Sequence, residues 1–360
     1  MSAAVCVLGM GTAVPENRLS AEAFAELAIR LSANSPKEEG LVRAVARRSG
    51  VAERGIVLPR GESGAAPFYP PLASPGTAER MGAYEELAPA LAAAAARAAL
   101  ANSGIDAGAI THLVTASCTG FSAPGVDLYL VGALGLSADV ARVHVGFMGC
   151  HGAVNACRVA RALASENTDA RVLVVAVELC TIHFQYGLGR DELLPNALFA
   201  DGAAAMVIGA GEAPLRLLGT ASRVIPNSAH AMTWRIADTG FRMTLDSSVP
   251  DLIAAHVRVF VESALARHGL SVDDVAGWAI HPGGPRVIDS ALAGLGLPSA
   301  AGDASRDVLR HHGNMSSATV LFVLEELLRR GTCGPIAALA FGPGLTAELA
   351  LFAATAPSSA

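Results

Sequence analysis

The stretch Val143-His144-Val145-Gly146-Phe147-Met148-Gly149-Cys150-His151-Gly152-Ala153 decides how this chain is interpreted. An extended apolar run ends at two glycines, a helical pattern follows, and Cys150 stands at the turn. The first N–H groups of a helix have no partner within the helix and favour an anion, so a thiol placed there has a lowered pKa. The alternative is a small buried hydrophobic residue, which is the common fate of a free cysteine. The flanking glycines favour a nucleophile, because they let a substrate approach closely.

Two later stretches carry the partners that such a nucleophile needs. In Trp278-Ala279-Ile280-His281-Pro282-Gly283-Gly284-Pro285, His281 lies between an apolar run and a sharply turning loop. In His312-Gly313-Asn314-Met315-Ser316-Ser317-Ala318, Asn314 precedes an apolar helical pattern. Taken alone, the histidine is also explained as a solvated loop residue and the asparagine as a helix N-cap. Together with Cys150 they predict a Cys-His-Asn site for acyl transfer.

Composition excludes several classes of protein. The chain has 360 residues, of which 52% are hydrophobic and 16% charged, so we expect a well-packed globular enzyme rather than a disordered chain. The length exceeds what one core usually supports, which predicts two cores or two fused halves. The net charge is −6 and no basic patch is visible, so nucleic acid is not an expected partner.

The cysteines indicate a reducing compartment. All six are scattered in apolar surroundings without a CxxC pair, so we expect neither a zinc ribbon nor a redox motif, and a cytoplasmic location. Adjacent histidines at 311 and 312 lack a spaced acidic partner, so we expect no metal site. Arg97 interrupts the alanine-rich stretch after Tyr84, so we expect no membrane insertion there.

Hydrophobic patterning predicts alternating strands and helices. We expect strands over 5–8, 112–117 and 171–179, loops over 9–15 and 65–76, and helices over 19–33, 78–103 and 153–165. The run 171–179 is apolar on both faces, as in a parallel sheet. The segments 198–209 and 340–351 each join a glycine-containing turn to an apolar strand. This weak repeat predicts two fused halves, residues 1–211 and 212–360.

The motifs as a set resemble those of a known family. Phe147-Met148-Gly149-Cys150-His151-Gly152-Ala153, the stretches around His281 and Asn314, and Phe341-Gly342-Pro343-Gly344-Leu345-Thr346 resemble the type III polyketide synthases. These are chalcone-synthase-like enzymes of the thiolase superfamily, and the cysteine motif is closer to bacterial members. The resemblance runs over nearly the whole chain.

The resemblance implies an α/β protein with a thiolase-like αβαβα layered fold of two pseudo-repeated halves. It also implies a homodimer that uses acyl-CoA and malonyl-CoA with no metal and no organic cofactor. Cys150 matches the nucleophile, and His281 and Asn314 match the other catalytic positions. Phe199 matches an aromatic gatekeeper between CoA tunnel and cavity, and Arg48 falls near the cation for the CoA phosphates. The remaining substrate-binding positions are Cys118, Thr119, Cys180, His183, Ser316 and Gly344.

The starter and product are less constrained. Cys118 and Cys180 are small for a cavity wall, which suggests a long alkyl starter and an alkylresorcinol or alkylpyrone product. One alternative is a ketoacyl synthase III-like enzyme that condenses once with an acyl carrier protein. A hydrolytic cysteine enzyme and a non-catalytic CoA- or lipid-binding protein are further alternatives.

Overall fold

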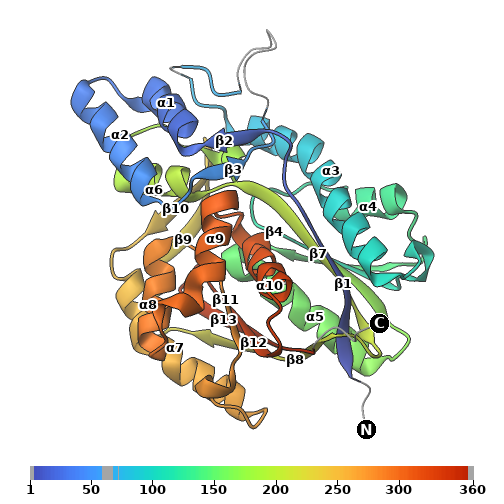
Figure 1. Ribbon diagram of the computed structural model, residues 1–360. Coiled ribbons are helices and arrows are strands. Elements are labelled where there is room, and N and C mark those ends of the chain that lie inside the picture. The colour runs from blue at the N-terminus through green and yellow to red at the C-terminus, as the bar shows by residue number, and fades with distance from the viewer. Residues whose placement is uncertain (1–3, 59–67, 72, 356–360) are drawn as a thin grey trace.

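The computed structural model describes residues 4–58, 68–71 and 73–355. The strands are β1 (Val5–Ala13), β2 (Arg18–Ser20), β3 (Glu53–Gly55), β4 (His112–Ser117), β5 (Ala141–Gly146), β6 (Arg171–Leu179), β7 (Asp201–Ala210), β8 (Leu215–Val224), β9 (Met232–Ala237), β10 (Gly240–Leu245), β11 (Gly277–Ile280), β12 (Gly334–Gly342) and β13 (Thr346–Ala354). The helices are α1 (Ala21–Ser32), α2 (Pro36–Arg48), α3 (Thr77–Ser103), α4 (Val126–Leu134), α5 (Gly152–Glu166), α6 (Arg190–Leu198), α7 (Val249–Ala266), α8 (Pro285–Leu295), α9 (Asp303–His312) and α10 (Thr319–Arg329). α1 and α2 lie together at one end of the molecule (Figure 1).

The main sheet repeats one strand pattern. Across the described residues its nine strands run in the order β11-β12-β13-β8-β1-β7-β6-β4-β5. β4 and β6 are parallel and β6 and β7 antiparallel, and the same relations hold for β11, β12 and β13. β1 and β8 pair in the middle and join the two sets. The predicted pseudo-repeat is therefore present, while the division between residues 211 and 212 stays a prediction.

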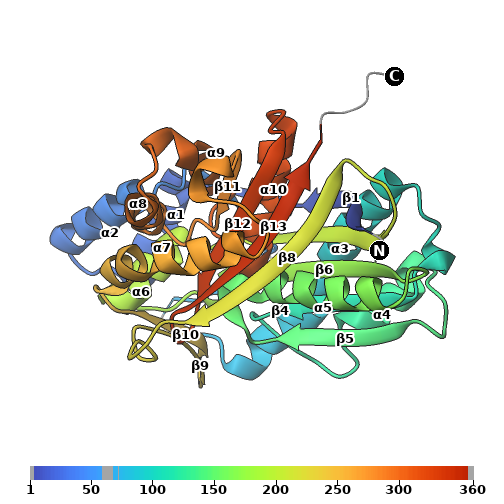
Figure 2. The same cartoon turned by 90° about the horizontal axis from the view of Figure 1, so that it is seen from below.

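The helices form three layers around this sheet. Val174 of β6 and Ala338 of β12 belong to one core that also contains α5 and α10. Their neighbours face away from it: Val175 lies in the core under α3, and Leu339 in the core with α7 and α8. Side chains alternate in this way because successive residues of a strand point to opposite faces. α5 and α10 are thus central, with α3 on one outer side and α7 and α8 on the other (Figures 1 and 2). The three helix layers and the two halves of the sheet between them make five layers, so the predicted αβαβα fold is confirmed.

The first strand is longer than the sequence predicted. β1 continues to Ala13, so the expected loop is wrong over residues 9–13. Gly11 pairs with Ala205 of β7 and lies directly under α3, where an added Cβ would be 2.4 Å from the backbone nitrogen of Ala99. Glycine in a strand allows such a close approach of two backbones, whereas the sequence pattern was interpreted as a turn.

The other predicted elements are largely confirmed, but α1 begins later than expected. Leu19 pairs in β2, and the hydroxyl of Ser20 caps α1 by accepting from the N–H of Ala23 at 3.1 Å. Serine favours this N-cap position because its oxygen satisfies a free N–H group. The predicted loop over 65–76 lies partly outside the described residues.

The contact between β1 and α3 leads to a stability prediction. We expect Gly11→Ala to lower the free energy of unfolding by about 1–3 kcal/mol, because the methyl group overpacks the helix backbone. Gly40→Ala is the matched control: nothing lies within 4 Å of a Cβ there, inside α2, so about 1 kcal/mol of stabilisation is expected. Urea unfolding measures both. An unchanged free energy for Gly11→Ala would contradict the close approach.

Candidate active site

Cys150 lies at the predicted elbow between a strand and a helix. A short turn, residues 149–151, follows β5 and leads into α5 at Gly152. Gly149 has a φ of 76°, a left-handed conformation that favours glycine. A Cβ at Gly149 would lie 2.3 Å from Cδ of Pro343, so the elbow fits against the turn after β12 only with glycine. The position of Cys150 is therefore fixed between the N-terminal and C-terminal parts of the chain.

His281 and Asn314 reach the same narrow space as Cys150. His281 directly follows β11, and its backbone N–H donates to the carbonyl of Leu339 at 2.7 Å. Its side chain is buried, and neither ring nitrogen has a hydrogen-bond partner among the described residues. A cavity of about 30 Å³ is lined by Cys150, His281, Asn314 and Phe199, among others. The structure thus brings together three side chains that are far apart in sequence.

Asn314 is fixed by its neighbours rather than acting as a helix cap. Its Oδ1 accepts from the backbone N–H of Ser316 at 2.9 Å. This bond uses the oxygen of the amide, so the Nδ2 hydrogens can still donate to another group. Its backbone binds Leu198 and Ala200, the residues on either side of Phe199. The N-cap alternative is wrong, because α10 begins only at Thr319. These backbone bonds therefore place the side-chain amide of Asn314 next to Phe199.

Burial dominates the electrostatics of the site. Desolvation raises the pKa of the Cys150 thiol to about 12, although contacts with Ser316 and Asn314 oppose this increase. Desolvation, together with a smaller contribution from His151, lowers the pKa of His281 to about 3. Burial penalises each charged form taken singly. A thiolate and an imidazolium are consequently favourable here only as a pair that forms together.

The wall beside Cys150 contains two further thiols. A space of about 10 Å³ is lined by Cys118, Thr119, Cys150, Cys180 and Ser316, among others. The hydroxyl of Ser316 lies 3.0 Å from Sγ of Cys118 and 3.7 Å from Sγ of Cys150. Ser316 therefore bridges the candidate nucleophile and its neighbouring thiol.

Glu178 is a buried residue that sequence reasoning missed. It is fully buried near the end of β6 and accepts from the N–H of Cys118 at 3.0 Å and from Thr119 at 2.7 Å. It also accepts from the hydroxyl of Ser317, which follows Ser316. A single carboxylate in an otherwise apolar strand was the signal, because a buried charge needs several hydrogen bonds. Glu178 holds the wall residues in place.

A large cavity lies next to the small one. It has a volume of about 510 Å³ and shares Cys180, Phe199, Trp234 and Met243 with the space beside Cys150. Cys118 lines only the smaller space. No sequence motif pointed to Trp234, whose place depends on the β9–β10 hairpin. Its indole N–H donates to the carbonyl of Cys118 at 2.7 Å.

His183 lines the large cavity, and both of its nitrogens are occupied. Nε2 lies 2.6 Å from the carbonyl oxygen of Thr119, and Nδ1 accepts from the N–H of Phe241 at 3.0 Å. A carbonyl only accepts, so Nε2 carries the proton. The ring also stacks on Phe241, with centroids 4.3 Å apart. Burial lowers the pKa of His183 to about 3, so the ring is a neutral part of the wall.

The remaining predicted residues lie around the site. Gly344 belongs to the turn after β12, where its N–H donates to the carbonyl of Met232, and Pro343 is the turn residue that lines the small space. Arg48 is exposed at the end of α2. Two residues later, a Cβ at Gly50 would lie 3.1 Å from Pro285, which begins α8 just after the His281 loop. Arg48 is thus near that loop rather than in the cavity.

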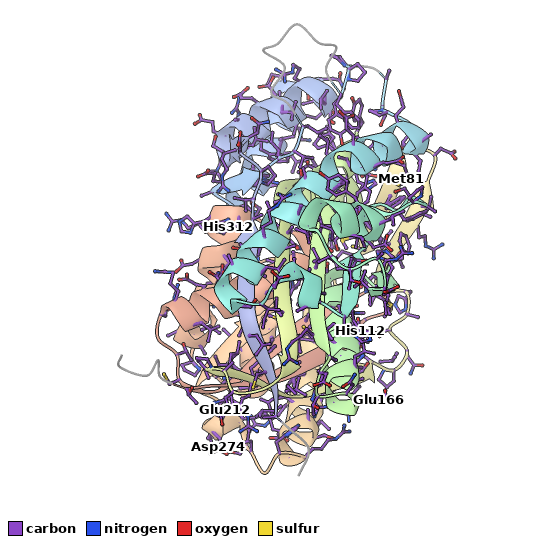
Figure 3. All side chains as sticks on the ribbon, turned by 90° about the vertical axis from the view of Figure 1, so that its right-hand side faces the viewer. Met81, His112, Glu166, Glu212, Asp274 and His312 are labelled. Atoms are coloured by element: carbon purple, nitrogen blue, oxygen red, sulfur yellow. The ribbon has the colours of Figure 1, made fainter. Side chains whose placement is uncertain are left out.

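The described residues contain neither a metal-binding cluster nor a membrane-spanning helix. No three His, Cys, Asp or Glu side chains in the described ranges are placed to hold a metal ion. No helix in those ranges is both long enough and apolar enough to cross a membrane. His312, labelled in Figure 3 at the end of α9, is one of the adjacent histidines considered from the sequence.

Family models match both parts of this chain. The N-terminal domain model of the chalcone and stilbene synthases matches residues 2–212, and the C-terminal domain model matches residues 216–355. A 1,3,6,8-tetrahydroxynaphthalene synthase from Streptomyces peucetius subsp. caesius is 36% identical, covering 96% of this chain and 92% of the relative. The alpha-pyrone synthesis polyketide synthase-like Pks18 of Mycobacterium tuberculosis strain H37Rv is 35% identical, covering 76% and 72%.

Solved structures agree with the sequence relatives. The crystal structure of PKS-I from the brown alga Ectocarpus siliculosus superposes with a TM-score of 0.92 and 29% identity, covering 99% of both chains. The C-terminal type III polyketide synthase domain of Steely1 from Dictyostelium superposes with a TM-score of 0.89.

The opposing pKa shifts lead to a test of the pairing between Cys150 and His281. In His281→Gln no imidazolium can offset the burial that raises the pKa of Cys150, so at pH 7 iodoacetamide should alkylate the variant at least about tenfold more slowly than the wild type. Because the thiolate is the reactive form, the rate in the variant should then rise about tenfold per pH unit toward pH 12. Mass spectrometry follows the labelled peptide, and Cys150→Ala corrects for the other thiols. Equal rates at pH 7 would mean that His281 does not stabilise the thiolate.

Proposed function

This chain belongs to the type III polyketide synthases, the family of the chalcone and stilbene synthases, and from that premise we propose its reaction. Cys150 holds an acyl starter from acyl-CoA, malonyl-CoA units lengthen it, and the product cyclises. The observation that carries this proposal is the meeting of Cys150, His281 and Asn314 at one buried space.

Loading of the starter uses Cys150 and His281. His281 takes the proton of the thiol, and the thiolate attacks the carbonyl carbon of the acyl-CoA thioester. The bond between that carbon and the CoA sulfur breaks, and the departing CoA thiolate takes the proton back from His281. The acyl group then remains on Cys150 as a thioester. Two ring nitrogens without partners among the described residues leave His281 free for this exchange.

Extension uses His281 and Asn314 as hydrogen-bond donors. Malonyl-CoA loses CO₂, and the electron pair of the broken C–C bond forms an enolate whose oxygen faces these two donors. One such donor is typically worth about 2.7–4 kcal/mol to the transition state. The enolate carbon attacks the acyl carbonyl, Cys150 leaves as a thiolate, and the lengthened chain on CoA is transferred back to it. Phe199 next to Asn314 helps to exclude water from the departing carboxylate.

This reaction needs CoA thioesters and neither a metal nor an organic cofactor. Each step above is completed by side chains of this chain and by the CoA sulfur. The single-condensation ketoacyl synthase is not favoured, because the matched models and the relatives named above are chalcone synthase-like polyketide synthases.

We propose a long alkyl starter and an alkylresorcinol- or alkylpyrone-type product. The support is the cavity of about 510 Å³ beyond Cys180, Phe199, Trp234 and Met243, a size typical of small-molecule sites. Apolar side chains of α1, among them Phe24 and Leu27, line its outer part. Burial of an alkyl tail in this cavity would contribute about 0.8 kcal/mol of binding free energy per methylene group.

Filling the outer end of the cavity tests the starter. Ala23 of α1 lines the large cavity and not the small spaces, so we expect Ala23→Trp to reduce use of lauroyl- and palmitoyl-CoA about tenfold and to leave hexanoyl-CoA unchanged. Glu22→Trp, on the same helix but outside the lining, is the matched control. Mass spectrometry of products from malonyl-CoA and this starter series gives the result. Unchanged long-chain use would refute the cavity as the tail site, and absence of any malonyl-dependent product would refute the synthase itself.

Arg48 is proposed to contact the CoA phosphates. It has no ion-pair partner in the part of the chain that the structure describes, and the end of α2 contacts the loop after His281. The labelled acidic residues Glu166, Glu212 and Asp274 lie at the opposite end of the molecule from α1 and α2 (Figure 3). Arg47 and Arg48 lie together in the last turn of α2, and this pair of cations favours an anionic nucleotide there.

A truncated substrate isolates this contact. We expect Arg48→Ala to raise the KM for malonyl-CoA about threefold, because an exposed charge pair is worth roughly 0.5–1 kcal/mol. The KM for malonyl-N-acetylcysteamine, which lacks the nucleotide phosphates, should not change. Arg43→Ala is the control, since Arg43 lies on the same helix but pairs with Glu26 at 2.8 Å. An equal rise with both substrates would exclude a phosphate contact.

We also propose that a second copy of this chain covers β5, which gives a homodimer in the cytoplasm, where CoA thioesters are made. β5 is an edge strand whose residues are mostly exposed. Met148, which is 41% exposed, follows two residues after the end of β5. Phe121, which is 51% exposed, packs its ring edge-on against Phe147, the residue directly after β5. An exposed edge strand with apolar neighbours is normally covered by another chain or element.

A further inference from the structure

A buried chain of polar side chains begins at the residue next to the nucleophile, and the proposed steps do not use it. His151 is 2% exposed, and its Nδ1 lies 2.7 Å from Oδ1 of Asn155, one turn further along α5. Nδ2 of Asn155 donates to Oε1 of Glu348 at 3.1 Å. Glu348 also accepts from Ser222 at 2.7 Å and contacts Arg158, whose side chain is half-exposed. This series of hydrogen-bonded side chains therefore connects the elbow of Cys150 with the protein surface.

The hydrogen-bond acceptors of Asn155 and Glu348 determine one tautomer of His151. The carboxylate of Glu348 only accepts, so the amide of Asn155 turns its nitrogen toward it and its oxygen toward His151. That oxygen needs a donor, so the proton of the neutral imidazole is on Nδ1 and the lone pair on Nε2. Burial lowers the pKa of His151, which favours the neutral ring.

The ring of His151 lies between the elbow and the turn after β12. An added Cβ at Gly342 would be 2.2 Å from Cδ2 and 2.6 Å from Nε2 of this ring, so the two are in close contact. On the other side of the elbow, Gly149 packs on Pro343. β12 also holds the backbone of His281 through Leu339. A change in the His151 ring is consequently transmitted to both Cys150 and His281.

We propose that His151, held in its Nδ1–H tautomer by Asn155 and Glu348, is a positioning residue that fixes the Cys150 elbow against the turn at residues 341–344. Asn155 of α5 and Gly342 of β12 face its ring, and Glu348 of β13, which is held by Ser222 of β8 and Arg158 of α5, lies behind Asn155. Its effect on turnover rests on the proposed function, whereas its tautomer does not.

Two variants distinguish the positioning role of His151 from a general effect on protein stability. Asn155→Leu breaks the link between His151 and Glu348 and leaves the contacts of Glu348 with Ser222 and Arg158 in place. Ser222→Ala removes a contact of the same carboxylate without breaking the link. We expect Asn155→Leu to lower kcat for malonyl-CoA decarboxylation about tenfold with KM within twofold, and Ser222→Ala to retain the wild-type values. In Ser–His–Asp enzymes a wrong histidine tautomer costs about 10⁴-fold, and the effect is smaller here because His151 does not itself react.

The tautomer is read directly from imidazole nitrogen shifts of protein labelled with nitrogen-15 histidine, with the His151 signal assigned by its loss in His151→Phe. The expected result is an Nδ1–H tautomer at pH 7 in the wild type and in Ser222→Ala, and its loss in Asn155→Leu. An Nε2–H tautomer or a charged ring in the wild type would overturn the proposal, even if Asn155→Leu does not fold. Wild-type kcat in a folded Asn155→Leu would also overturn it. A wild-type protein that does not decarboxylate malonyl-CoA would instead refute the proposed function.

Discussion

Two buried carboxylates determine how the N-terminal and C-terminal parts of this molecule fit together. Glu178, on β6, accepts from Thr119 nearby and from Ser317 just before α10. Glu348, on β13, accepts in return from Asn155 of α5. A buried carboxylate is costly unless several donors surround it, so each requires the other part of the chain in the correct place. The apolar layers supply most of the driving force, and these hydrogen bonds select one arrangement of them.

The candidate active site depends on this fixed arrangement, because its parts come from separate segments. Cys150 lies in the turn before α5, His281 directly follows β11, and Asn314 precedes α10. Two of these positions are held by backbone hydrogen bonds, and the third by close contact of Gly149 with Pro343. The same packing removes water from the thiol and from the imidazole, which is why burial shifts both pKa values so strongly. The ring nitrogens of His281 lack partners among the described residues, and a protein tolerates such a cost mainly at a functional site.

Sequence reasoning succeeded where local chemistry determines the structure. The elbow at Cys150, the strand before His281 and the buried strand β6 follow from glycine placement and apolar runs, and all are present. It was wrong at Gly11, because a glycine pattern does not distinguish a turn from a strand beneath a helix. It also gave no indication of Trp234 or of the large cavity, since both arise from packing between segments distant in sequence. The family motifs indicated which side chains matter, but only the fold places Asn314 beside Phe199.

The repeated strand order has a consequence for the ancestry of the molecule. β4, α5, β6 and β7 in one half correspond to β11, α10, β12 and β13 in the other. Such a pattern is what duplication of one gene and fusion of the copies would leave behind. Joining two self-associating units in one polypeptide replaces their encounter in solution by a high effective concentration. It also frees the two copies to diverge, and here the turn before α5 carries a thiol whereas the turn before α10 carries alcohols and an amide.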